Sequence, residues 1–169
     1  MLDLESKIIS INALAAWRAS VRRAGLKLVA TNGCFDLLHA GHVIYLEAAR
    51  KLGDALLIGL NGDASVRALK GFGRPINSEL DRARVLAALA SVDAVCIFPE
   101  VTATRFLSLA EPECYVKGGD YRLETLNRDE REAVEKSGGQ IVLLPLVAGR
   151  STSALLAKMR EETKPPIEN

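Results

Sequence analysis

The chain alternates short apolar runs with segments in which apolar residues recur at helical spacing. Five of these runs have the length and composition of buried strands. Strands that alternate with helices form β-α-β units, so the pattern predicts a three-layer α/β/α fold around a five-stranded parallel sheet. The expected strands are Leu26–Ala30, Ala55–Leu60, Ala94–Phe98, Cys114–Val116 and Gln140–Leu144.

A single domain over residues 1–169 is expected, because the chain is long enough for one well-packed core and too short for two ordinary ones. Ser10 is placed to cap a covering helix over about residues 10–24. Ser78 is placed to cap another, with Leu80 and Ala83 on its core face. Further helices are expected at Thr102–Ala110, at Arg128–Lys136 and around Leu155, before a frayed tail at about 162–169.

The overall charge gives no reason to expect a highly charged partner. With 22 basic and 21 acidic residues the net charge is +1, so we expect neither nucleic acid nor a membrane as a partner. Three cysteines without a paired spacing, and an amino terminus unlike a signal peptide, favour a cytoplasmic protein. A homodimer is expected only because it is the commonest soluble assembly.

The stretch from Thr31 to His42 joins the first expected strand to a helix and contains both histidines of the chain. Amides at a helix start suit an anion, and His39 and His42 share one face if the helix begins near His39. The histidines could also serve as capping or packing residues. A zinc site with Cys34 is a further alternative, but it lacks a well-placed fourth ligand.

Polar groups also follow the other expected strands, and parallel strands bring their carboxyl ends to one edge of the sheet. Asn61-Gly62-Asp63 follows the second strand, although an ordinary turn explains it equally well. Lys117-Gly118-Gly119-Asp120 follows the fourth, where the glycines allow either close approach to a ligand or a tight turn. Arg150-Ser151-Thr152-Ser153 opens the last helix, where helix capping and phosphate binding are compatible.

The loop Lys70–Asn77 contains Lys70, Arg74 and two glycines. A flexible basic loop could close over a phosphorylated substrate. A solvated loop with incidental charge is the commoner meaning of such a stretch.

The candidate groups are mainly cations and hydrogen-bond donors. No nucleophilic serine or cysteine lies in an elbow motif, and no carboxylate pair is placed for acid–base chemistry. Such a set suits reactions that depend on positioning and charge stabilisation. A phosphate that attacks another phosphate needs no general base, so the pattern favours nucleotidyl transfer.

His39-Ala40-Gly41-His42 and Arg150-Ser151-Thr152-Ser153 resemble the two signature motifs of the HxGH nucleotidyltransferases. The blocks at 31–42, 50–54, 61–63, 70–77 and 116–121 resemble, in order, the D-glycero-β-D-manno-heptose 1-phosphate adenylyltransferase domain of ADP-heptose synthesis. The resemblance implies a Rossmann-like fold. It also implies transfer of AMP from ATP to a sugar 1-phosphate, with Mg²⁺ delivered by ATP and no metal ligand from the protein.

The resemblance also implies a role for each matching residue. The catalytic set is His39, His42, Lys70 and Arg150. The nucleotide would contact Asn32, Gly33, Cys34, Phe35, Gly41, Lys117, Gly119, Asp120, Ser151 and Thr152. The sugar phosphate would contact Asp36, Asn61, Asp63, Lys70 and Arg74.

Two departures from the family pattern qualify these roles. Ser153 stands where a second threonine is common, so the role of that hydroxyl is open. The sugar kinase often fused to this domain is absent, so a separate kinase is expected to supply the sugar phosphate. A cytidylyltransferase acting on glycerol phosphate or a related alcohol phosphate, and a non-catalytic nucleotide-binding module, are the alternatives.

Overall fold

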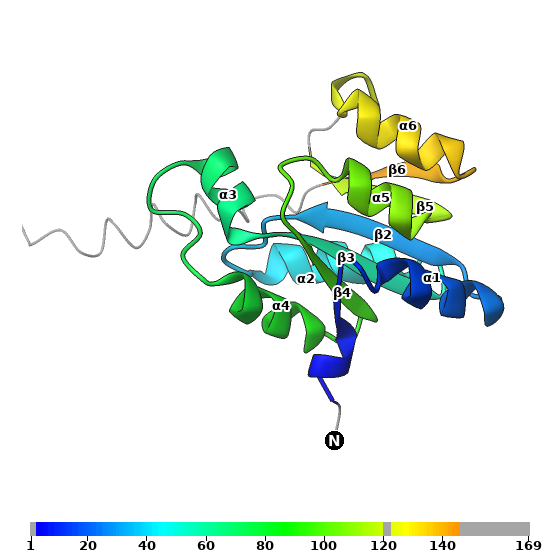
Figure 1. Ribbon diagram of the computed structural model, residues 1–169, viewed down its shortest axis with the longest axis horizontal. Helices are drawn as coiled ribbons and strands as arrows, with labels where there is room; N and C mark the ends of the chain where they lie inside the picture. The colour runs from blue at the N-terminus through cyan, green and yellow to red at the C-terminus, as the bar shows by residue number, and fades with distance from the viewer. Residues whose placement is uncertain (1–2, 120–122, 146–169) are drawn as a thin grey trace, which may run out of the picture.

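The computed structural model describes residues 3–119 and 123–145. They form a six-stranded parallel sheet, in the order β1-β4-β3-β2-β5-β6, with helices on both faces (Figure 1). The strands are β1 (Ile8–Ser10), β2 (Leu28–Gly33), β3 (Ala55–Asn61), β4 (Ala94–Phe98), β5 (Cys114–Gly118) and β6 (Gln140–Leu144). The α-helices are α1 (Leu14–Arg23), α2 (Ala40–Arg50), α3 (Asp63–Lys70), α4 (Glu79–Ala87), α5 (Thr104–Ala110) and α6 (Arg128–Lys136), and 3₁₀ turns cover Glu5–Lys7 and Leu123–Thr125.

Two hydrophobic cores lie on opposite faces of the sheet, because successive side chains of a strand point to opposite sides. Leu28 and Ala30 of β2 pack with residues of α1, α5 and α6 on one face. Val29 of the same strand packs with residues of α2 and α4 on the other. The predicted Rossmann-like three-layer fold is therefore confirmed, with six strands in place of five.

The order of the strands in the sheet reverses at β2. From β2 the chain continues to β3 and β4 on one side, and β5 and β6 then pair on the other side of β2. Ligands of open α/β sheets bind where the strand order reverses, beyond the carboxyl ends of the strands. Tyr45 of α2 stabilises this point, because its hydroxyl hydrogen-bonds the hydroxyl of Thr31 (2.7 Å) and donates to the carbonyl of Val116 (3.0 Å).

The prediction for the amino-terminal segment is wrong. Ser10 does not cap a helix. It ends β1, a three-residue edge strand paired with β4 from Ile8 opposite Val95 to Ser10 opposite Ile97. The covering helix starts later, at Leu14. A run of two apolar residues gives no strand pattern by itself, and β1 depends on a partner more than 80 residues away.

A second difference is α3, which occupies a segment read as a turn followed by a loop. Asp63 is the first residue of the helix and Lys70 the last, so the basic loop proper begins at Gly71. In Figure 1, α3 lies beyond the end of the sheet toward which β2 points. The predicted final helix around Leu155 and the predicted tail at 162–169 lie outside the described residues. Within the described part of the chain, no helix is long and apolar enough to cross a membrane.

Candidate active site

A cavity of about 1010 Å³ lies at the carboxyl ends of β2 and β5. It brings together the polar groups predicted from three strand ends and from the basic loop. Its lining includes ten of the predicted site residues: Asn32, Gly33, Cys34, Phe35, Asp36, His42, Asn61, Lys70, Arg74 and Lys117. His39, Gly41, Asp63 and Gly119 are described but do not line it. Asp120, Arg150, Ser151 and Thr152 lie outside the described residues.

The two histidines form the amino-terminal cap of α2. The Nδ1 atom of His39 accepts a hydrogen bond from the amide of Gly41 (3.1 Å), and the Nδ1 atom of His42 accepts one from the amide of His39 (3.3 Å). The rings are close together, with centroids 3.9 Å apart. A ring nitrogen that accepts carries no proton, so this geometry assigns neutral rings that carry their hydrogen on Nε2.

The environment of His42 favours the same protonation state. Burial, followed by the neighbouring His39, lowers the pKa of His42 to about 4. Phe35 lies against it with ring centroids 5.5 Å apart. Phe35 itself has φ +43°, an unusual conformation for a side chain of this size, and its ring would lie 3.1 Å from a Cβ atom at Gly33. Gly33 therefore leaves the room that this turn needs.

A lysine of β5 lines the same cavity. Lys117 is 9% exposed, and its ammonium donates to Oδ1 of Asn32 (2.7 Å) and lies 3.5 Å from Oε2 of Glu130. The hydroxyl of Tyr115 donates to the same Asn32 oxygen (2.6 Å). Burial lowers the pKa of Lys117, and the nearby Glu130 carboxylate opposes that shift.

Glu130 was missed in the sequence because it lies in a highly charged helix. It is 7% exposed, and its Oε1 atom accepts from the amide of Ala103 (2.8 Å). Val134, four residues later, is fully buried on the same face of α6. The sequence signal that could have identified Glu130 was a carboxylate at a core-facing position of an amphipathic helix.

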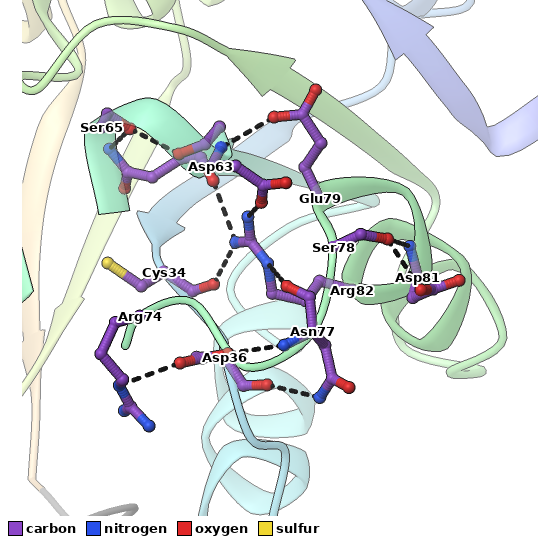
Figure 2. A network of polar contacts seen from close by, with 12 residues as sticks. Cys34, Asp36, Asp63, Ser65, Arg74, Asn77, Ser78, Glu79, Asp81 and Arg82 are labelled. Atoms are coloured by element: carbon purple, nitrogen blue, oxygen red, sulfur yellow. Dashed lines mark hydrogen bonds and ion pairs between the residues drawn. The ribbon is translucent and has the colours of Figure 1, made fainter. Parts of the chain in front are cut away.

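The acidic and amide groups predicted to bind substrate have partners within the protein (Figure 2). Asp36 accepts from the amide of Ile76 (2.7 Å) and pairs with Arg74 (3.1 Å). Asn61 donates to Ser65 (3.3 Å), and Asp63 pairs with the buried Arg82 (2.7 Å). Their contacts with substrate stay predictions.

The described residues offer neither a metal cluster nor an activated thiol. No group of three histidine, cysteine, aspartate or glutamate side chains within residues 3–119 and 123–145 is arranged to hold a metal ion. Burial raises the pKa of the Cys34 thiol, which opposes the formation of a nucleophilic thiolate. Hydrogen-bond donors and cations therefore line one cavity, as the transfer of a phosphate group requires.

Comparison with known proteins identifies the class. Residues 30–163 match the model of the cytidylyltransferase-like family. The chain belongs to this family and is a nucleotidyltransferase, as the sequence motifs predicted.

Its relatives include proteins named bifunctional protein HldE. That of Geotalea uraniireducens is 49% identical over 158 residues, which cover 94% of this chain and 32% of the relative. That of Streptomyces coelicolor is 53% identical over 146 residues, covering 86% of this chain and 31% of the relative. The chain thus spans about a third of the length of these curated relatives.

Solved structures agree with the fold. The lipopolysaccharide core biosynthesis protein from Thermoplasma volcanium has a TM-score of 0.60 and 26% identity, and the match covers 73% of this chain and 98% of that one. The pantoate-beta-alanine ligase from Francisella tularensis, solved with β,γ-ATP and β-alanine, has a TM-score of 0.57, covers 86% and 68%, and is 13% identical. The second likeness supports the fold alone.

Proposed function

We propose that the protein transfers AMP from ATP to D-glycero-β-D-manno-heptose 1-phosphate, giving ADP-heptose and pyrophosphate. The observation that carries the proposal is a single cavity in which His42, Lys70, Arg74 and Lys117 meet at the switch point of the sheet. Similarity to proteins named HldE, together with the motif blocks of the sequence, supports a place in ADP-heptose synthesis.

The reaction requires positioning more than proton transfer. An oxygen of the sugar phosphate forms a bond to the α-phosphorus of ATP, and the bond from that phosphorus to the bridging oxygen of the β-phosphate breaks. The attacking phosphate is already ionised near neutral pH, so no general base is needed. The departing pyrophosphate takes the negative charge that develops on the bridging oxygen, and hydrogen-bond donors from His39 and His42 would stabilise this charge.

The remaining residues would bind the two substrates. The amides of Gly33, Cys34 and Phe35 would hold the triphosphate, and Lys70 and Arg74 the sugar phosphate. Further nucleotide contacts are proposed for Asn32, Gly41, Lys117, Gly119, Asp120, Arg150, Ser151 and Thr152. Mg²⁺ would enter as part of the ATP substrate. A kinase reaction must supply the sugar 1-phosphate.

A panel of substrates tests the proposal. The purified protein is incubated with ATP, CTP, GTP or UTP and with heptose 1-phosphate or glycerol 3-phosphate, and pyrophosphate release is measured. The proposal expects release with ATP and heptose 1-phosphate. Release only with CTP and glycerol 3-phosphate would replace it with the cytidylyltransferase alternative, and ATP binding without release from any pair would indicate a binding module.

A further inference from the structure

A buried arginine lies at the centre of the network in Figure 2. Arg82 of α4 is 2% exposed. Its Nε atom donates to the carbonyl of Asn77 (3.1 Å) and Nη1 donates to the carbonyls of Cys34 (2.5 Å) and Asn61 (2.9 Å). Its Nη2 atom pairs with the carboxylate of Asp63 (2.7 Å). One side chain therefore contacts the backbone of three separate segments.

Each of these segments leads to a part of the cavity. Cys34 belongs to the turn between β2 and α2, where the triphosphate amides are proposed. Asn61 ends β3 directly before α3, the helix that ends at Lys70. Asn77 ends the basic loop 71–77. A guanidinium is a rigid plane with fixed donor directions, so Arg82 sets the positions of the three segments relative to one another.

Asp36 ties the same turn to the same loop a second time. Its Oδ1 atom accepts from the amides of Ile76 (2.7 Å) and Asn77 (3.2 Å). The side-chain amide of Asn77 donates to the backbone carbonyl of Asp36 (2.9 Å). The Nε atom of Arg74 lies 3.1 Å from Oδ2 of Asp36. Both the side chain and the backbone carbonyl of Asp36 thus connect the turn to the loop.

We propose that Arg82 is a positioning residue for nucleotidyl transfer. It does not line the cavity, yet it holds the turn proposed for the nucleotide and the segments proposed for the acceptor phosphate at a fixed separation. In-line attack depends on that separation, because a misplacement of about 1 Å can cost about 100-fold in rate. The inference rests on the proposed function.

The chain supplies a matched control in Arg18, which is also 2% exposed. Arg18 of α1 donates through Nε (3.2 Å) and Nη2 (3.0 Å) to the carbonyl of Glu111 and pairs with Glu113. Both partners precede β5, at the end of the sheet opposite the cavity. Lysine at either position keeps the charge but cannot donate in several fixed directions.

The experiment compares Arg82→Lys with Arg18→Lys in thermal unfolding and steady-state kinetics, well below both melting temperatures. Both variants are expected to lose stability. Arg18→Lys should keep kcat and both KM values within about twofold, whereas Arg82→Lys should raise the KM for ATP and for the acceptor together and lower kcat about 100-fold. A structural role alone would lower stability without moving both KM values.

Kinetics of Arg82→Lys that match those of Arg18→Lys, or a rise in only one KM, would overturn the proposal. If Arg82→Lys does not fold, Asp63→Asn takes its place, because it removes the countercharge of Arg82 but keeps an oxygen acceptor. It should raise both KM values severalfold, and unchanged values would overturn the proposal.

Failure of the proposed function is distinguishable from failure of this proposal. If the unsubstituted protein released no pyrophosphate with any substrate pair, the proposed function would fail. The positioning role of Arg82 would then be tested by measuring the affinity of each variant for a non-hydrolysable ATP analogue. The proposal expects weaker binding in Arg82→Lys than in Arg18→Lys, and equal affinity would overturn it.

Discussion

The two sides of the cavity present positive character in different ways. On the α2 side, His42 lines the cavity and His39 lies against it without lining the cavity. Both are neutral rings whose Nδ1 atoms accept hydrogen bonds from backbone amides at the helix start. On the β5 side, Lys117 is a formal cation that lies 3.5 Å from the carboxylate of Glu130. Burying a neutral donor costs less free energy than burying an ion, and the buried lysine therefore needs a countercharge. We expect loss of a histidine to lower mainly the rate, and loss of Lys117 to lower both the rate and the stability.

The largest expected effect is the loss of a histidine. His42→Ala and His39→Asn should each lower kcat about 100-fold to 1,000-fold, because each removes an Nε2 donor from the developing charge. Asparagine at position 39 keeps an acceptor for the helix cap, so its stability should change little. Pyrophosphate release and thermal unfolding are measured together. Turnover near that of the unsubstituted protein would refute a catalytic role for that histidine.

A smaller effect on turnover is expected on the lysine side, together with a loss of stability. Lys117→Met leaves the Glu130 carboxylate buried without its cation, which should cost about 3 kcal/mol of unfolding free energy and lower activity about 10-fold to 100-fold. The double variant Lys117→Met/Glu130→Gln should recover stability but not activity. Recovery of both would show that Lys117 is structural.

An exposed cation should affect one substrate only. Lys70→Ala is expected to raise the KM for the acceptor about 10-fold with little change in the KM for ATP, because Lys70 is exposed and lines the cavity together with Arg74. Arg67→Ala is the matched control, since Arg67 is exposed one turn earlier on α3 and does not line the cavity. Equal kinetics for both variants would show that Lys70 is a solvated surface residue without a role in substrate binding.

The last prediction concerns the pH dependence of stability. The pKa of His42 is about 4 in the folded protein, below the usual value for histidine near 6.5. Between these values the unfolded chain takes up a proton that folded His42 does not, so stability falls as the pH drops from about 6.5 to 4 and is fully present above 6.5. Melting temperatures over this range should fall more steeply for the unsubstituted protein than for His42→Asn. Parallel curves would contradict the lowered pKa.

The elements that were predicted best from the sequence are those defined by a local pattern of residues. The strands at Ala94–Phe98 and Gln140–Leu144 and the helix at Arg128–Lys136 have the same bounds in the structure. The edge strand β1 could not be predicted in this way. Its few residues form a strand only because β4 pairs with them.

The candidate site shows the same division between local and long-range information. Motif spacing and strand ends predicted that His42 and Lys117 lie at one edge of the sheet, and Lys70 was predicted in a loop that could close over the substrate; all three line the cavity. Arg82 was missed because the core face of its helix was read from apolar residues alone. Leu80, predicted on that face, is 51% exposed, and Arg82 is buried instead. Its partners are backbone carbonyls of distant segments, which no local pattern specifies.

The role proposed for the histidine pair is that of neutral hydrogen-bond donors toward phosphate. Long-range ¹H–¹⁵N NMR of the histidine rings at pH 7 tests it most directly, because each ring nitrogen reports whether it carries a proton. Both rings are expected to be neutral with the hydrogen on Nε2, and the His42 signal should titrate with a midpoint near pH 4. A charged ring at pH 7, or a hydrogen on Nδ1 of either histidine, would contradict it.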